Sequence, residues 1–349
     1  MKRTGKMILW LMIMSLLTGC QGTGVTADTK VVLTTGFEQD EVFRIDEESC
    51  RKAELLVYLT NLKNQYEQIY GVRLWEKEAN GIPLSDSLKE VALARIAQVK
   101  VMKLLAAQKG ILLSAEEEEK VKQAADLYTS SLSQEELNLL GTNLEGITSM
   151  YQEYALANKL YDHIIKDVNP EISDDEARTI SVEQIFLRCY SLNGKGEKVP
   201  YSQEQCEEVE QKAREVVGML AQGEDFTKLS ERYSDHQTGL YSFGKGEMEE
   251  AFETAAFNLG TGEVSEAIRG EDGYYIIKCI STFNREETEA NKINIVTMRK
   301  KEVFEQEYNQ FLKTLTRNMN EKAILEISVP EKREEETADF FKIYEDVFR

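Results

Sequence analysis

The most constraining part of this sequence is the stretch from Gln222 to Ile280, in which short apolar patterns alternate with turn signals. Phe226, Leu229 and Tyr233 recur at helical spacing, whereas 274–280 is rich in the aromatic and β-branched residues that favour strands. The pattern therefore predicts two short helices followed by two strands. The expected positions are 225–233 and 248–259 for the helices, 264–268 and 274–280 for the strands, and 271–273 for the tight turn between the strands.

Four motifs in this stretch, in this order, resemble the parvulin-type peptidyl-prolyl isomerase domain. They are G-E-D-F-x-K-L-S-E-R-Y-S (223–234), F-G-K-G-E-M-x-x-x-F-E-x-A-A-F-x-L (243–259), G-E-V-S-E (262–266) and D-G-Y-Y-I-I-K (272–278). The first strand of such a domain is expected upstream, at Val182–Arg188. The resemblance then covers residues 180–283 and implies a small antiparallel sheet flanked by helices.

The charge balance bears on possible partners. The chain carries 42 Lys and Arg residues against 62 Asp and Glu residues, for a formal net charge of −20. Binding to a phosphate backbone is disfavoured because each contact would work against the field of the protein itself. We therefore expect no nucleic-acid partner, and most of the acidic residues are expected on solvated helix surfaces.

The first 19 residues have the features of a processing signal. Three basic residues precede an apolar run at 7–17, which is too short to span a membrane but suits the core of a signal peptide. Leu17-Thr18-Gly19-Cys20 resembles the lipobox of bacterial lipoproteins, which implies lipidation of Cys20. The small polar segment 20–30 is then expected to be a tether. An ordinary signal peptide with a chance cysteine is the alternative.

The cysteine and histidine usage indicates neither a metal site nor a cofactor. Apart from Cys20, the cysteines are Cys50, Cys189, Cys206 and Cys279, and their spacing contains no CxxC pair. Buried free thiols fit their apolar surroundings better than disulfides do. His163 and His236 are the only histidines, too few for a histidine-based metal site.

Residues 31–170 are expected to form a mostly helical region. Short strands are predicted at 31–37 and 41–45, and a helix at 48–71. Ser85 or Ser87 is expected to cap the next helix, and Ser114-x-x-Glu117 and Ser133-x-x-Glu136 are capping boxes that begin two more. A long helix over 144–168 then ends at Asn169-Pro170, and 171–179 is a charged linker.

The C-terminal segment 284–349 is expected to complete the helical region. It contains an amphipathic helix at 295–315, a predicted strand at 323–329 and a last amphipathic segment at 339–348. An isolated strand needs a partner, and the segment 31–45 is the best candidate. The sequence thus predicts an α+β chain, in which a mostly helical domain built from both chain ends holds the parvulin-like domain as an insert.

This organisation, behind a lipobox, resembles the extracytoplasmic foldases of the PrsA and SurA type. The resemblance implies a protein anchored through Cys20 to the outer face of a bacterial cytoplasmic membrane, as in Gram-positive bacteria. Its expected partners are unfolded secreted polypeptides that contain X–Pro bonds. No cofactor is expected, because rotation about an amide bond requires no covalent chemistry.

An isomerase must lower a barrier of about 18–20 kcal/mol by binding the twisted amide better than the planar one. The resemblance implies that Leu240, Met248 and Phe252 form the apolar pocket for the proline ring, with Phe243 and Phe257 nearby. Methionine and aromatic residues at such spacing are also typical of a plain core. The coincidence of three motif positions favours the pocket, whereas Phe257 fits the core better.

The polar centre of the family is altered in this chain. The family places one histidine on the first strand and one on the last, with a Cys or Asp between them. Here these positions hold Gln184, Tyr275 and His236, and the resemblance carries the catalytic role to these three residues. A lone histidine in a loop is more often solvated than catalytic.

Two functions therefore remain open at this point. The first is a foldase that binds X–Pro segments and isomerises them. The second is a holdase chaperone whose degenerate rotamase domain only binds, and the replacement of both histidines favours it. A solute-binding lipoprotein is disfavoured, because residues 48–168 lack the strand pattern of two α/β lobes.

Overall fold

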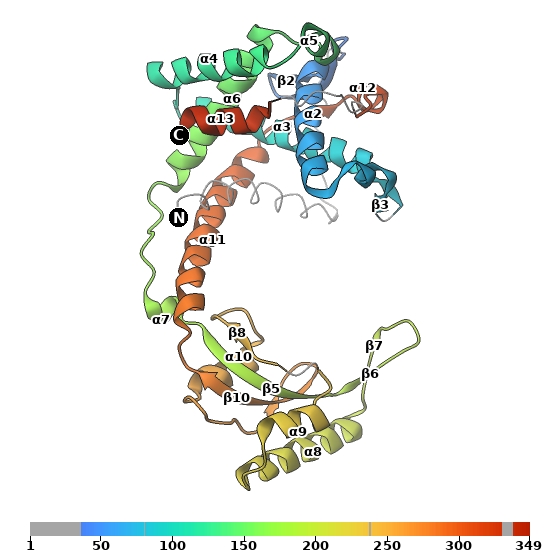
Figure 1. The fold of residues 1–349 in the computed structure, drawn as a ribbon, viewed down its shortest axis with the longest axis vertical. Coiled ribbons are helices and arrows are strands. Elements are labelled where there is room, and N and C mark those ends of the chain that lie inside the picture. Colours follow the sequence, from blue (N-terminus) through green and yellow to red (C-terminus); the bar gives the residue numbers. More distant parts are fainter. Residues whose placement is uncertain (1–35, 80, 237–238, 330–337) are drawn as a thin grey trace. The chain divides into compact units, whose positions relative to one another are not determined.

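The computed structural model describes residues 36–79, 81–236, 239–329 and 338–349 (Figure 1). The expected signal peptide 1–19, Cys20, the tether 20–30 and most of the strand expected at 31–37 lie outside these ranges. The chain divides into two compact units. The helical unit comprises the chain up to Asp167 together with Lys301–Arg349, and the sheet unit comprises Val168–Lys300.

The helical unit is built mainly from helices, and side chains cap the starts of several of them. Its helices are α2 (Lys52–Tyr70), α3 (Leu84–Gln108), α4 (Ala115–Ser130), α5 (Gln134–Leu140), α6 (Leu144–Ile165), α12 (Glu321–Glu326), α13 (Phe340–Phe348) and the 3-10 helix η2 (Val72–Glu76). Side-chain caps begin α4, α5, α6, α12 and α13 but not α2 or α3. The capping boxes at Ser114 and Ser133 are both confirmed. The residue that caps α3 is Pro83, so the predicted caps Ser85 and Ser87 were wrong, because both serines lie inside that helix.

Both ends of the chain meet in one small sheet of the helical unit. Its strands, in the order β11-β1-β2, are Arg317–Met319, Glu41–Ile45 and Glu48–Arg51. Phe43 pairs with Met319 across the antiparallel β1–β11 ladder. The predicted strand at 323–329 was wrong, because 321–326 is the helix α12, capped by the Asn320 side chain, and the pairing strand lies just before it. The helix predicted from 48 begins only at Lys52, because 48–51 form β2.

The core of the helical unit is aromatic and includes the end of the chain. Phe340 in α13 is fully buried and stacks on Tyr151 at 4.0 Å between ring centroids. Its backbone N–H donates to the side chain of Asn61 at 2.8 Å, and its carbonyl accepts from the Tyr151 hydroxyl at 2.8 Å. Asn61 also donates to the hydroxyl of Tyr128. These bonds satisfy polar groups that are costly to bury unpaired.

The sheet unit contains a four-stranded antiparallel sheet in the order β8-β5-β10-β9. Its strands are β5 (Ile180–Arg188), β8 (Tyr241–Phe243), β9 (Ile268–Arg269) and β10 (Gly273–Ser281), and its helices are α7 (Asp174–Ala177), α8 (Gln203–Ala221), α9 (Phe226–Tyr233) and α10 (Glu250–Asn258). The short strand β8 lies between the two helices predicted at 225–233 and 248–259, where no strand was predicted. The strand predicted at 264–268 was wrong in extent, because Val264 makes only an isolated bridge to Lys278.

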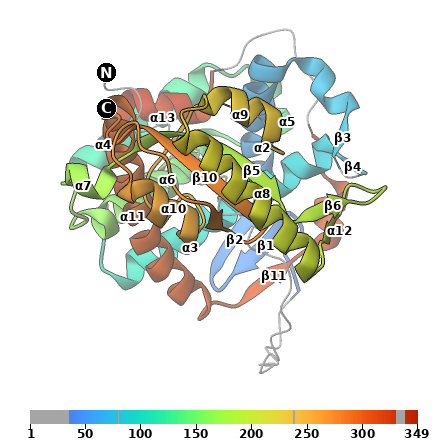
Figure 2. The same ribbon diagram turned by 90° about the horizontal axis from the view of Figure 1, so that it is seen from below.

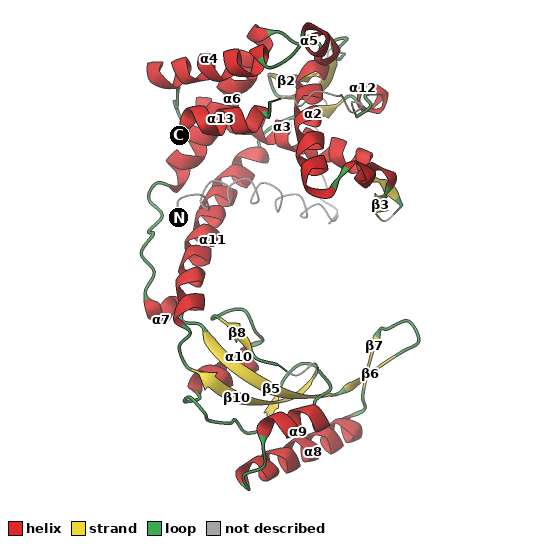
Figure 3. Cartoon of the chain, in the orientation of Figure 1, coloured by secondary structure: helices red, strands yellow, loops and turns green. Residues whose placement is uncertain are grey.

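Two two-stranded hairpins and one long helix complete the chain. The hairpins pair β3 (Glu78–Ala79) with β4 (Ile82–Pro83) and β6 (Tyr190–Leu192) with β7 (Lys198–Pro200), and the latter projects from the sheet (Figure 3). Helix α11 (Arg285–Leu312) begins in the sheet unit and ends in the helical unit. Its first residue lies ten residues before the predicted start at 295. The predicted class, a mostly helical chain with a small antiparallel sheet domain, is confirmed.

The sheet separates two apolar clusters. Ile185 and Ile276 face α8 and α9, which cover the side seen in Figure 2, whereas Val182 and Ile277 face α10. The four cysteines in the described ranges are free thiols, and Cys206 alone among them is only partly buried. None of the described helices combines the length and the apolar character that crossing a membrane requires.

Candidate functional site

Strands β5 and β10 bring the predicted polar positions onto the α10 side of the sheet. Side chains alternate between the two faces of a strand, so Gln184 and Phe186 share one face. Tyr275 pairs with Phe186 across the ladder, and Ile277 pairs with Gln184. Strand register therefore brings two of the three predicted polar residues, Gln184 and Tyr275, to neighbouring positions on one face.

An aromatic floor lies beside these positions. Phe252 in α10 is fully buried, and its ring centroid is 5.1 Å from that of Tyr275 and 5.6 Å from that of Phe243. Met248, just before α10, packs against the same cluster and is only partly buried. The rings of Tyr275 and Phe186 are also adjacent, at 4.7 Å. Three residues predicted for the pocket, Phe243, Met248 and Phe252, thus belong to one apolar cluster.

The segment after α9 fixes the position of His236. The Ser234 hydroxyl accepts from the backbone N–H of Phe186 at 3.1 Å, and the N–H of Asp235 donates to the carbonyl of Phe186 at 2.7 Å. The Asp235 carboxylate also accepts from the N–H of Arg188. This segment therefore bonds to the edge of β5 beyond the end of β8. His236 follows it and lies over Phe186, with 4.2 Å between ring centroids.

Several polar atoms in this region are buried without a hydrogen-bond partner among the described residues. They are Gln184 Oε1, the hydroxyl of Tyr241 and Glu249 Oε1. Burial raises the pKa of Tyr275 to about 12, and the negative charge of Glu249 adds to the shift. Burial raises the pKa of Tyr241 as well. Both tyrosines therefore keep their protons at neutral pH and offer neutral hydroxyl groups.

Two predicted pocket residues remain, Leu240 and Phe257, and only Leu240 lies outside this cluster. Leu240 is 60% exposed and belongs to none of the buried clusters in the described chain. Phe257 packs edge-on against Phe243 at 5.7 Å, and its other neighbour is the guanidinium of Arg178, 4.9 Å from the ring centroid. These contacts are those of a core residue at the rim of the cluster.

Two residues near the site were not singled out from the sequence. Tyr241 alternates with Phe243 in Tyr-Ser-Phe, a period-two pattern that could have indicated β8. Glu249 directly follows Met248 and precedes α10, so its position beside a predicted pocket residue was visible. The sequence did not reveal that these two residues lie close to Tyr275, because strand pairing and helix docking bring them there and no local pattern records it.

The described arrangement supplies apolar surface, ring faces and neutral hydroxyl groups. It contains no cysteine or serine paired with a base. Among the described residues there is no group of three or more His, Cys, Asp or Glu side chains that could hold a metal ion. A site of this composition is suited to binding a small apolar ring.

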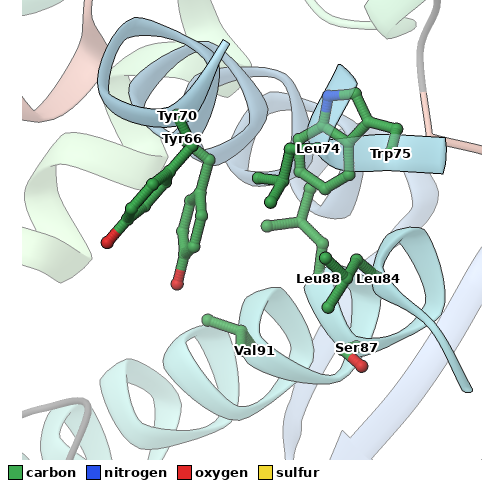
Figure 4. Close-up of a pocket in the computed structure, with 8 residues that line it drawn as sticks. All are labelled: Tyr66, Tyr70, Leu74, Trp75, Leu84, Ser87, Leu88 and Val91. Carbon is green, nitrogen blue, oxygen red and sulfur yellow. The ribbon is translucent and has the colours of Figure 1, made fainter. Parts of the chain in front are cut away.

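A concave site lies in the helical unit, between α2, η2 and α3 (Figure 4). Its volume is about 270 Å³, and its lining residues are Tyr66, Tyr70, Leu74, Trp75, Leu84, Ser87, Leu88 and Val91. The rings of Tyr66 and Tyr70 extend from α2 toward Val91 on α3. The Trp75 indole N–H donates to Glu67 at 2.7 Å, which holds this wall in place.

Comparison with known proteins finds a family match inside the sheet unit. Residues 194–281 match the family named Rotamase and described as the PPIC-type PPIASE domain. The chain carries a rotamase domain. The match begins after β5, so the strand with Gln184 precedes the matched residues, while His236, Met248, Phe252 and Tyr275 lie within them. The parvulin-type resemblance predicted from the motifs is confirmed.

Proteins similar to this chain include several that are named foldase protein PrsA. The foldase protein PrsA of Caldanaerobacter subterraneus is 26% identical over 247 residues, covering 68% of this chain and 72% of that protein. The foldase protein PrsA of Geobacillus kaustophilus is 36% identical over 109 residues, covering 26% of this chain and 39% of that protein. A crystal structure of PrsA from Bacillus cereus aligns over 76% of this chain and 92% of its own, with 20% identity and a TM-score of 0.37.

Proposed function

We propose that this protein is an extracytoplasmic foldase that binds unfolded secreted polypeptides and binds or isomerises their X–Pro bonds. The observation that carries the proposal is the apolar cluster of the rotamase domain, in which Met248 and Phe252 lie beside Tyr275 and Phe186. Rotation about an X–Pro bond moves no proton and breaks no bond. A catalyst needs only to bind the twisted amide more tightly than the planar amide.

In this proposal the aromatic floor receives the proline ring, and Gln184, His236 and Tyr275 surround the amide. The buried oxygen of Gln184 without a partner supports a role in contacting the substrate, because a ligand N–H would satisfy it. Leu240 is exposed and contributes the outer wall. Phe243 belongs to the floor, and Phe257 packs against Phe243 at the rim of the same cluster.

The proposal includes anchoring to the outer face of the cytoplasmic membrane through a lipid on Cys20. Its support is the sequence around Leu17–Cys20, which follows a basic start and an apolar run. A diacylglyceryl group supplies two acyl chains, and two chains are sufficient for stable anchoring. The domain boundaries in this proposal are a tether at 20–30, a chaperone region at 31–170 and 284–349, and a rotamase domain at 180–283 joined by the linker 171–179.

A holdase chaperone without isomerase activity is the second candidate. Two observations favour it. Gln184 and Tyr275 replace the two histidines that the parvulin resemblance implies, and the helical unit has its own aromatic pocket. Tyr70 in that pocket is 64% exposed, and the nearby Ile69 is 73% exposed, so apolar surface is available to an unfolded chain.

The test is the isomerisation rate of X–Pro tetrapeptides with the purified full-length chain, measured by NMR exchange spectroscopy. For a foldase we expect acceleration that falls about tenfold in Met248→Ala, because the pocket loses an apolar wall. Met298→Ala is the matched control. Met298 lies on α11 and is 60% exposed, so this substitution removes the same kind of side chain at a position outside the cluster. His236→Ala tests whether the imidazole contributes.

Each outcome assigns a role. Acceleration that falls in His236→Ala assigns the polar centre to Gln184, His236 and Tyr275, whereas acceleration unchanged in that variant leaves the apolar pocket as the catalyst. No acceleration, together with peptide binding and with suppression of reporter aggregation that survives Met248→Ala, supports the holdase. Neither acceleration nor binding of any proline peptide would reject both candidates.

A further inference from the structure

One carboxylate at the edge of the rotamase pocket lacks a counter-charge. Glu249 lies between Met248 and the first residue of α10. Its Oε2 accepts from the backbone N–H of Glu271 at 3.1 Å, while its Oε1 is buried and accepts no hydrogen bond from the described residues. We propose that Glu249 makes this pocket selective for proline segments that carry lysine or arginine next to the proline.

The carboxylate and the ring of Tyr275 meet over Gly270. A Cβ built on Gly270 would lie 2.0 Å from Glu249 Oε1 and 2.5 Å from Tyr275 Cε2. Only glycine at this position leaves room for both groups, so the backbone of the β9–β10 turn is shaped around them. The same Tyr275 ring contacts Phe252 and Phe186. The negative charge therefore lies at the margin of the aromatic floor.

Three basic side chains of the sheet unit contact groups other than Glu249. Arg188 pairs with Asp235 at 3.6 Å, Lys198 pairs with Asp272, and Arg178 lies over Phe257. Within the described ranges no Lys or Arg nitrogen is paired with Glu249. Burial is the main cause of the raised pKa of Tyr275, and the nearby charges of Glu249, Asp272 and Glu271 add to it. The charge of Glu249 is thus left for a ligand to neutralise.

A basic side chain fits this environment in two ways. An ammonium or guanidinium group is attracted by the face of a tyrosine ring and by a carboxylate at the same time. The terminal torsion of a glutamate is broad, so the Glu249 carboxylate can reorient when a cation binds. A neutral residue gains neither interaction, and an acidic residue is repelled. The chemistry therefore selects for a cation rather than for apolar character beside the proline.

This inference rests on the proposed proline pocket, so the test separates the two. Binding of fluorescein-labelled tetrapeptides to the full-length chain is measured by anisotropy at low and at physiological salt. The peptides carry Lys, Ala or Glu before the proline or after it, and each has a partner with alanine in place of proline. We expect the Lys peptide to bind at least about tenfold more tightly than the Glu peptide at low salt, with a smaller ratio at higher salt.

The variant Glu249→Gln keeps the shape of the side chain and removes its charge. We expect the ratio of Lys to Glu peptide affinities to fall to about one in Glu249→Gln while the Ala peptide binds as before. Glu250→Gln is the matched control, because Glu250 is the next residue and is exposed. It removes the same charge from the whole protein.

One of the results that overturn the inference is obtained with the wild-type chain alone and so does not depend on the folding of a variant. Equal affinity of the wild-type chain for Lys and Glu peptides would reject it, as would a ratio that survives in Glu249→Gln or falls equally in Glu250→Gln. If peptides with proline bind no better than those with alanine, the proposed proline pocket fails as well.

Discussion

Tyr275 and Gln184 change what the centre of the rotamase domain can do. An imidazole titrates near neutral pH, whereas burial raises the pKa of Tyr275 to about 12, with a contribution from the charge of Glu249. Gln184 does not titrate at all. The two residues can supply hydrogen bonds but cannot exchange protons near neutrality, and amide rotation requires no such exchange. Any activity is therefore expected to depend on complementarity to the twisted amide.

Phe252 is the residue on which the aromatic floor depends most. It is fully buried and contacts both Tyr275 and Phe243. We expect Phe252→Ala to lower the free energy of unfolding of the rotamase domain by about 3–5 kcal/mol, because it opens a cavity between α10 and the sheet. Urea unfolding followed by circular dichroism measures the change.

Leu240→Ala is the control for this prediction. Leu240 is a predicted pocket residue but is 60% exposed, so its truncation is expected to change stability by no more than about 0.5 kcal/mol. Equal losses in the two variants would contradict the division of the pocket into a buried floor and an exposed wall.

At the scale of elements, the sheet that joins the chain ends depends on one buried carboxylate. Glu41 at the start of β1 is 1% exposed and accepts from the backbone N–H of Glu38, from Ser49 and from Arg44. Its own carbonyl accepts from the side chain of Asn320, just after β11. Burial alone would raise the pKa of Glu41, but the hydrogen bonds outweigh it and lower the pKa to about 2.

A carboxylate whose pKa is lowered by folding stabilises the fold above its ordinary pKa, near 4.5, and this contribution is lost as the pH falls toward 2. We expect Glu41→Gln to cost about 2 kcal/mol at pH 7 and much less at pH 2. Urea unfolding of both proteins at the two pH values measures this. Glu47→Gln, in the exposed turn after β1, is the control, and a loss at pH 7 that persists undiminished at pH 2 would contradict the assignment.

At the scale of the whole molecule, the two units have separate cores. The core of the helical unit includes α13, where Phe340 lies among Tyr58, Tyr128 and Tyr151. The rotamase domain has its two clusters on either side of its own sheet. Chains of this kind often unfold in more than one step, because each core is cooperative by itself.

We therefore expect Phe340→Ala to destabilise the helical unit by about 3–5 kcal/mol and to leave the rotamase domain unchanged. Differential scanning calorimetry should show one of two transitions shifting to lower temperature. Phe348→Ala, near the chain end and only partly buried, should shift it less. A single transition that shifts as a whole would mean that α11, which enters both units, couples them into one cooperative body.

Much of this architecture follows from the sequence because local signals carry it. The capping boxes at Ser114 and Ser133, the apolar periodicities and the four motifs between 223 and 278 predicted most helices, the strand β10 and the rotamase resemblance of residues 194–281. Strand alternation alone predicted that Gln184 shares a face with Phe186. These signals act between residues close in sequence, where spacing and conformation are directly linked.

The tertiary structure decided what depends on pairing between distant segments. Residues 323–329 have strand propensity, yet Asn320 caps a helix there, and 317–319 are the residues that complete the sheet with β1. Tyr241 and Glu249 approach Tyr275 only because β8 pairs with β5 and α10 docks on the sheet. Burial and the lack of a partner are properties of the packed chain, so the uncompensated charge of Glu249 was not visible in the sequence. The motifs determine the kind of domain, and packing determines which atoms are left for a ligand.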